Sequence, residues 1–157
     1  MKQKHIAFKN TGYFSSLICD YLDEKPELSP FYNRFPNLEN FKDQIKEKGN
    51  DFSLDKRNTL VSVLKKQYQN IETSALTKTH IESLKSKNTF TITTGHQLNL
   101  FTGPLYFLYK IVSAINLSKE LKEKFPEYNF VPIYWMATED HDFAEINHIN
   151  FAMPLES

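Results

Sequence analysis

The spacing of apolar residues along this chain follows two patterns, which meet near Thr89. Before Thr89, apolar side chains recur three or four positions apart, as at Phe14, Leu17, Ile18 and Tyr21, and this is the period of an amphipathic helix. The pattern predicts helices over residues 11–22, 38–49, 53–70 and 73–88. We therefore expect residues 1–88 to form a helical N-terminal region.

Several residues in this region mark expected helix ends. Residues 24–37 hold three prolines, of which Pro30 and Pro36 should prevent a helix there. Gly49 is expected to end the helix that begins near residue 38, because glycine is common just past a helix C-terminus. Ser53 or Asp55 could cap the next helix, since either side chain can accept a hydrogen bond from a free backbone N–H group.

The second pattern is that of a βαβ unit. The β-branched, alternating stretch "TFTITT" (residues 89–94) predicts a strand, and apolar spacing predicts a long helix from Leu105 to about Lys124. The nearly continuous apolar run "FVPIYWMAT" (residues 130–138) predicts a second strand buried on both faces, with Trp135 in the core. This order of elements predicts two parallel strands and an α/β fold.

The sheet predicted within residues 89–157 is smaller than an ordinary one. Typical sheets hold about 5–6 strands, and both faces of a parallel pair need cover. We therefore expect residues 89–157 to be the start of a larger α/β core that further residues or another chain complete. The chain is then an incomplete fragment of a larger fold.

Composition and charge exclude some classes of partner. The chain has 19 Lys and Arg against 19 Asp and Glu, so its formal net charge of zero gives no general attraction to nucleic acid or to a membrane surface. No apolar run is long enough to span a bilayer, and the first ten residues hold no apolar segment of a secretory signal. The single cysteine, Cys19, fits a reducing, cytoplasmic setting.

The two predicted strands bring distant polar residues to one place. Parallel strands end at the same edge of a sheet, and ligands of open α/β sheets bind outside those ends. The first strand is expected to end around residues 93–96 and the second around residues 137–141. The polar residues that follow each strand should therefore line one cleft.

The stretch between the first strand and the long helix has the features of an anion-binding turn. Gly95 would let the backbone turn sharply as it leaves the strand, and Gly103 would do the same before the helix. Pro104 is expected at the first helical position, where free N–H groups and the helix dipole favour phosphate or carboxylate. Three side chains could add hydrogen bonds, namely His96, Gln97 and Asn99. A purely structural turn explains the same spacing, so both interpretations stay open.

An acidic segment, "EDHDFAE" (residues 139–145), follows the second strand, with His141 in its middle and no lysine or arginine nearby. Its acids could be solvated at a loop or helix N-terminus, which the helix dipole favours. They could instead bind a substrate amine or supply a general base. A third possibility is metal ligation, although the spacing matches no strong metal motif.

Together the two segments resemble a known family. The stretch "TGHQLNLFTGPLYFLYK" followed by "VPIYWMATEDHDFAEINH" resembles the bacillithiol biosynthesis cysteine-adding enzymes, a family of cysteine ligases. The resemblance implies a Rossmann-like core related to class I aminoacyl-tRNA synthetases, and a coiled coil that forms a homodimer in the full-length protein. It also implies a reaction that joins L-cysteine to glucosaminyl-malate through an amide bond. Family members are several times longer than this chain.

The resemblance matches residues 95–97, 102–104 and 139–142 to the family's signatures, and the chemistry of the residues suggests their roles. Asp140, His141 and Asp142 are expected to be catalytic, and one of them would deprotonate the attacking amine. Residues expected to bind substrate or nucleotide are Gly95, His96, Gln97, Asn99, Thr102, Gly103, Pro104 and Glu139. ATP or another nucleotide is the natural activating group, and no metal is assigned. The alternative is a nucleotide-binding or regulatory module without chemistry of its own.

Overall fold

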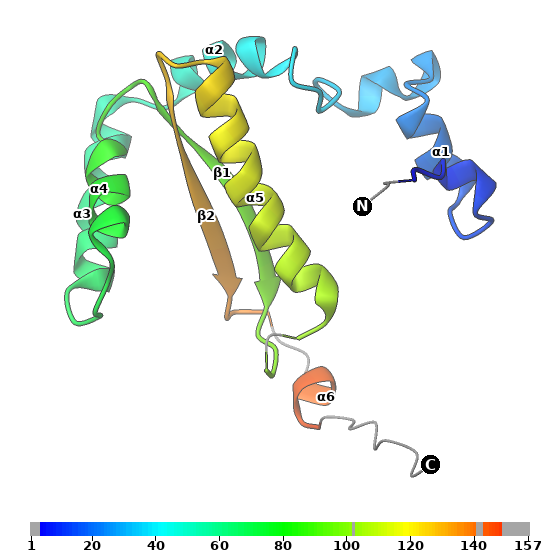
Figure 1. The fold of residues 1–157 in the computed structure, drawn as a ribbon. Helices are drawn as coiled ribbons and strands as arrows, with labels where there is room; N and C mark the ends of the chain where they lie inside the picture. The colour runs from blue at the N-terminus through cyan, green and yellow to red at the C-terminus, as the bar shows by residue number, and fades with distance from the viewer. Residues whose placement is uncertain (1–3, 102, 141–142, 149–157) are drawn as a thin grey trace. The chain divides into compact units, whose positions relative to one another are not determined.

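The computed structural model of the chain describes residues 4–101, 103–140 and 143–148, and its ribbon is drawn in Figure 1. The chain divides into two compact units, Met1–Glu47 and Lys48–Ser157. The described elements before Thr89 are all helices, and the βαβ unit begins at Thr89. The division into domains at residue 88 remains a prediction.

The first unit consists of short helices and aromatic contacts. Helix α1 (Ser16–Leu22) begins after Ser15, whose side chain accepts a hydrogen bond from the backbone N–H of Ile18. Two short 3-10 helices, η1 (Phe8–Asn10) and η2 (Pro26–Phe31), flank it in sequence. The expectation that Pro30 prevents a helix is wrong, because η2 contains it. A short 3-10 helix tolerates proline, since few of its N–H groups need a partner.

Helix α2 (Phe41–Asp51) contains the boundary between the two units. The prediction that Gly49 ends this helix is wrong, because the helix continues for two further residues. A glycine inside a helix costs only about 1 kcal/mol. A Cβ atom placed on Gly49 would lie 3.6 Å from the ring of Phe90, which is ordinary packing distance.

Helices α3 (Leu54–Tyr68) and α4 (Ala75–Ser83) both begin at a serine cap. Ser53, rather than Asp55, caps α3 and accepts a hydrogen bond from the N–H of Lys56. The two helices bury part of their apolar faces against a strand described below. The buried core cluster that results consists of Val61, Ile81, Leu84 and Val131.

The βαβ unit is present as the spacing predicts. Strand β1 (Thr89–Gln97) and strand β2 (Asn129–Ala137) are parallel, and helix α5 (Leu105–Lys124) connects them. The register pairs Thr89 with Asn129 and continues without a break to Gln97 and Ala137. This confirms the α/β fold, and α5 has the bounds that the sequence predicts.

The expectation that β2 is buried on both faces is wrong for its second half. Phe130 and Val131 are buried, but Trp135 and Met136 are 60% and 58% exposed, so Trp135 is not a core residue here. The sheet described by the structure has two strands, and each strand therefore has a free edge. β2 therefore carries more apolar side chains than the described elements cover.

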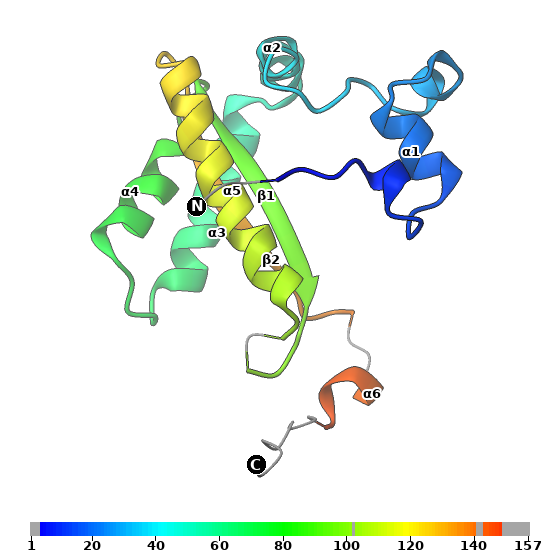
Figure 2. The same ribbon diagram turned by 45° about the vertical axis from the view of Figure 1, so that its right-hand side comes forward.

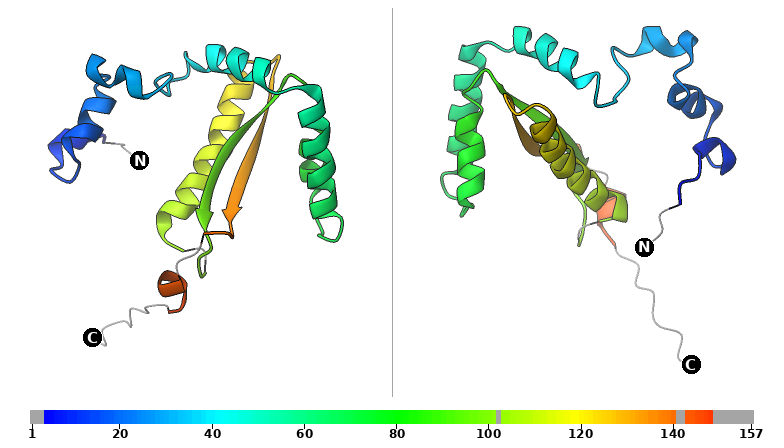
Figure 3. Two further views of the ribbon diagram at one scale, coloured as in Figure 1. Left: turned by 180° about the vertical axis from the view of Figure 1, so that it is seen from behind. Right: turned by 45° about the horizontal axis from the view of Figure 1, so that its top comes forward.

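Both strands end at the same edge of the sheet. Figures 2 and 3 show α5 along the sheet, with α3 and α4 on its other side. The loop after β1 and the short helix α6 (Phe143–Ile146) lie at the edge where the strands end. Among the helices within the described ranges, none combines the length and apolar character that crossing a bilayer requires.

Candidate functional site

The two polar segments predicted to meet at the sheet edge do meet. The side-chain amide of Gln97, at the end of β1, donates a hydrogen bond of 3.1 Å to Oδ2 of Asp140, which follows β2. These residues are 43 positions apart in sequence. The parallel register places them side by side, because Gln97 pairs with Ala137 at the last position of the ladder.

His96 has a defined orientation and a defined proton position. Its Nδ1 lies 3.0 Å from the backbone oxygen of Gln97, and its Nε2 lies 2.6 Å from the hydroxyl of Tyr106. A carbonyl oxygen can only accept, so Nδ1 carries the proton of the neutral ring. Nε2 then accepts, and the Tyr106 hydroxyl donates to it. The His96 ring also makes an edge contact with Phe107, with ring centroids 6.2 Å apart.

A pocket of about 380 Å³ lies between the end of β1 and the start of α5. Four residues predicted to bind ligand line it, namely His96, Asn99, Gly103 and Pro104. Tyr106 from α5 also contributes, as do Ile146 and His148 from α6 and the residues after it. A cavity of this size lies at the lower end of the range for small-molecule sites.

Gly103 has the backbone role that the sequence predicts. Its φ is +58°, and its N–H donates a 2.7 Å hydrogen bond to the carbonyl of Leu100. A Cβ atom at this position would lie 2.7 Å from Cγ of Asn99, a distance that real side chains do not reach. The positive φ therefore favours glycine here, and a larger residue would also have to displace the Asn99 side chain.

Gly95 is needed for a different reason from the one expected. It does not turn the chain sharply out of the strand, because it lies inside β1, and β1 continues through Gln97. A Cβ atom here would lie 2.6 Å from the backbone oxygen of Trp135 and 2.9 Å from its Cβ atom. Gly95 thus permits close approach of the neighbouring strand, where Trp135 is its register partner.

Pro104 precedes the helix instead of occupying its first position, where the sequence predicted it. It is the N-cap of α5, with φ −68° and ψ 153°, and the helix itself begins at Leu105. The cap makes no side-chain hydrogen bond to the first turn. The turn at Pro104 therefore presents backbone N–H groups at the positive end of the helix dipole, next to the pocket.

Lys110 lies beside the candidate site, and the sequence analysis did not select it. Its Nζ donates a 3.2 Å hydrogen bond to the carbonyl of Gly95 and lies 5.3 Å from the centroid of the Tyr106 ring. No other lysine or arginine occurs between Lys87 and Lys119. Its position four residues after Tyr106, on the same helix face, is the signal that could have identified it.

The acidic segment is only partly described. Glu139 and Asp140 are both exposed. The hydrogen bond from Gln97 joins Asp140 to β1. The predicted catalytic residues His141 and Asp142, and the predicted binding residue Thr102, lie outside the described residues. Within the described ranges, no group of three or more histidine, cysteine, aspartate or glutamate side chains could hold a metal ion.

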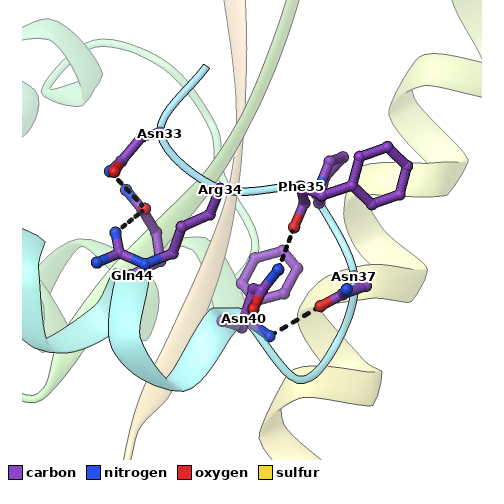
Figure 4. Close-up of a pocket in the computed structure, with 8 residues that line it drawn as sticks. Asn33, Arg34, Phe35, Asn37, Asn40 and Gln44 are labelled. Atoms are coloured by element: carbon purple, nitrogen blue, oxygen red, sulfur yellow. Dashed lines mark hydrogen bonds between the residues drawn. The ribbon is translucent and has the colours of Figure 1, made fainter. Parts of the chain in front are cut away.

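A second pocket, of about 290 Å³, lies within the first unit and is shown in Figure 4. Its polar side chains bond within its own wall: Asn40 donates to the carbonyl of Phe35 at 2.8 Å, and Arg34 donates to Gln44 at 3.1 Å. The same arginine pairs with Glu47. These contacts brace the connection into α2, and none of the residues predicted for the functional site lies here.

Comparison with known proteins shows which family the chain resembles. The family model described as "Bacillithiol biosynthesis BshC, N-terminal Rossmann-like domain" matches residues 1–155. Proteins named "Putative cysteine ligase BshC" are similar to it: one from Flavobacterium psychrophilum is 69% identical over 93% of this chain, and one from Cytophaga hutchinsonii is 42% identical over 91%. One from Bacillus thuringiensis is 32% identical over 94%.

The chain spans 28%, 27% and 26% of the length of these three relatives. The match with the family model nevertheless covers nearly every residue, and both polar segments of the sheet edge lie inside it. The parallel βαβ unit agrees with the Rossmann-like description. The chain belongs to the family of BshC N-terminal Rossmann-like domains of bacillithiol biosynthesis.

Proposed function

We propose that this chain is the part of a cysteine ligase that binds substrates for the joining of L-cysteine to glucosaminyl-malate. The reaction forms the amide bond of bacillithiol. Membership in the BshC family supports the proposal, because relatives of this domain carry the name of a cysteine ligase. The residues that would act are those at the shared end of β1 and β2.

The observation that carries this proposal is the hydrogen bond between Gln97 and Asp140. It joins the two polar segments beside a pocket, so that an anion and an amine could be held next to each other. A ligase that forms an amide needs this arrangement, because its reacting groups must be oriented within contact distance.

The pocket at the start of α5 suits an anionic group. The first turn of α5 presents backbone N–H groups at the pocket, and the side-chain amide of Asn99 is a further donor in its lining. The malyl carboxylates of glucosaminyl-malate or the phosphates of a nucleotide have the matching charge. ATP is the natural activating group, since a free carboxylate does not react with an amine. The pocket's size and donors fit a phosphate or carboxylate group.

Asp140 would act on the amine, with Glu139 beside it. Glucosamine carries an ammonium group at neutral pH, and an ammonium has no lone pair with which to attack. A carboxylate of the acidic segment would hold this group, and Asp140, His141 or Asp142 would accept its proton. The new C–N bond then forms as the activating group leaves the cysteine carboxyl with one of its oxygen atoms.

The test is bacillithiol formation by the complete protein, followed by mass spectrometry. Asp140→Asn and His141→Ala should each lower product formation by about 100-fold or more, the usual scale of proton-transfer catalysis, while circular dichroism stays that of the folded protein. Glu127→Gln, which removes an exposed carboxylate between α5 and β2, is the matched control and should keep full activity. Product formation that survives both site variants would overturn the assignment.

Titration separates this proposal from a binding module without chemistry. The complete protein is titrated with ATP, with glucosaminyl-malate and with cysteine, and consumption of each is followed. Nucleotide binding without consumption of either substrate would favour the module. The full-length protein is proposed to be a homodimer that pairs through a coiled coil and acts in the cytoplasm.

A further inference from the structure

We infer that binding of an anion in the pocket beside β1 is coupled to uptake of one proton by His96, with the Tyr106 hydroxyl as the group that switches. The inference rests on the proposed function, because it concerns the same pocket. It adds a coupling between ligand charge and the protonation of one named side chain.

The geometry of the His96–Tyr106 pair leads to this coupling. In the neutral ring Nδ1 donates to Gln97, so Nε2 accepts, and the 2.6 Å contact uses the proton of the Tyr106 hydroxyl. That hydroxyl then offers the pocket only lone pairs. A neutral pair therefore repels a carboxylate or phosphate oxygen placed against Tyr106.

Protonation of His96 reverses the direction of this hydrogen bond. A proton on Nε2 makes this nitrogen a donor, and the Tyr106 oxygen becomes its acceptor. The hydroxyl proton of Tyr106 is then free to turn toward the pocket, which both residues line. An anion gains one hydrogen bond and a nearby positive charge in this state, so binding must favour it.

His96 is the member of this pair that can take up a proton, because Nε2 of the neutral ring carries none. Lys110 lies over the Tyr106 ring and is already cationic, with its Nζ bonded to Gly95. Asp140 is joined to Gln97, the residue after His96. The other titratable groups that the described chain places around the pair are Tyr134, whose hydroxyl donates to the His96 carbonyl, and His148, which lines the same pocket.

Calorimetric titration of the complete protein with L-malate measures the coupling. The work is done at about pH 8, where both malate carboxylates are ionised and do not titrate. Repeating the titration in two buffers of different ionisation enthalpy gives the number of protons taken up, and up to about one is expected. His96→Asn should abolish the uptake, whereas His80→Asn, the matched control on α4 outside the pocket, should keep it.

Tyr106→Phe tests the switching hydroxyl. It should weaken malate binding by about tenfold or more, because a hydrogen bond to a charged group is lost. Tyr109→Phe, on the same helix and 64% exposed, is the control and should bind like the unchanged protein. Unchanged binding by Tyr106→Phe would overturn the role of the hydroxyl.

The outcomes separate this inference from the proposed function. Malate binding without proton uptake overturns the coupling but leaves the anion site in place. Proton uptake that survives His96→Asn has the same two consequences. Absence of binding by malate and by ATP alike counts against both. If His96→Asn does not fold, nitrogen NMR of the unchanged protein decides the question: the Nε2 signal of His96 must move to the protonated range as malate is added, and an unmoved signal contradicts the inference.

Discussion

Gln97 and Asp140 are joined by a 3.1 Å hydrogen bond across the ends of two parallel strands. Gln97 lies in the last register pair of the sheet, so the β1–β2 ladder fixes the backbone from which its side-chain amide extends. Asp140 lies beyond the ladder, so this bond is what ties its carboxylate to the strand that also carries His96. The orientation of the acidic segment should therefore depend on Gln97.

Gln97→Met should lower ligase activity by about tenfold, since it keeps the length of the side chain but removes the donor to Asp140. Stability should change by less than about 1 kcal/mol, because the bond is exposed. Gln69→Met, at the exposed C-terminal end of α3, is the control. Rates of product formation and urea midpoints are measured for both variants, and equal rates would show that Gln97 does not orient Asp140.

Gly95→Ala should destabilise the protein by about 1–3 kcal/mol, because the added methyl group would lie 2.6 Å from the backbone oxygen of Trp135. Two paired backbones must move apart to relieve this contact. Gly49→Ala makes the same chemical change inside a helix with room for it and should stabilise by up to about 1 kcal/mol. Thermal unfolding of both variants tests the comparison, and a Gly95→Ala protein as stable as the original would contradict it.

The sequence was sufficient for the βαβ unit and the meeting of its polar ends. The apolar spacing of α5 is regular from Leu105 onward, and "FPEYN" interrupts it after Lys124, so both bounds could be predicted. Parallel pairing follows from the connection by a long helix. The nearness of Gln97 and Asp140 then follows from topology alone, without knowledge of any side-chain contact.

Properties that depend on register or on loop closure could not be read from the sequence. The need for glycine at position 95 comes from its pairing with Trp135, and the spacing of residues does not give a register. The contact of His96 with Tyr106 requires the loop between them to fold back on the strand. Local patterns instead suggested a sharp turn at Gly95, and they did not single out Lys110.

The buried Arg57 on α3 leads to a prediction about stability. Its side chain is 3% exposed, and its guanidinium donates to the backbone carbonyls of Leu84 and Thr89 at 3.1 and 2.9 Å. Burial lowers the pKa of this group below its ordinary value, because water is removed from the charge. Arg57→Met should leave these carbonyls without a donor.

The expected loss for Arg57→Met is about 2–4 kcal/mol, from two buried acceptors left unpaired. Arg57→Lys should also be destabilising, since an ammonium cannot reproduce the planar arrangement of donors. Lys56→Met, at the neighbouring exposed position of α3, should change stability by less than about 1 kcal/mol. Chemical unfolding of the three variants decides the matter, and equal effects of Arg57→Met and Lys56→Met would contradict the role of Arg57.

Glu82 on α4 predicts how stability depends on pH. Hydrogen bonds from Lys65 and Lys85 hold the pKa of its carboxyl below the ordinary value, and Lys65 lies on the neighbouring helix α3. A lowered folded-state pKa means that the carboxylate stabilises the fold above the unfolded-state pKa, which is about 4.3 for glutamate. This contribution disappears as the pH falls through the folded-state value.

Glu82→Gln should therefore destabilise the protein at about pH 7, and the difference from the unchanged protein should shrink below about pH 4.3 and vanish once Glu82 is protonated in the folded protein as well. Because the group is fully exposed, added salt should reduce the difference as well. Glu72→Gln removes the same charge from the exposed connection between α3 and α4 and controls for net charge. Urea midpoints measured from neutral to acid pH would refute the bridge between α3 and α4 if Glu82→Gln and Glu72→Gln followed the same curve.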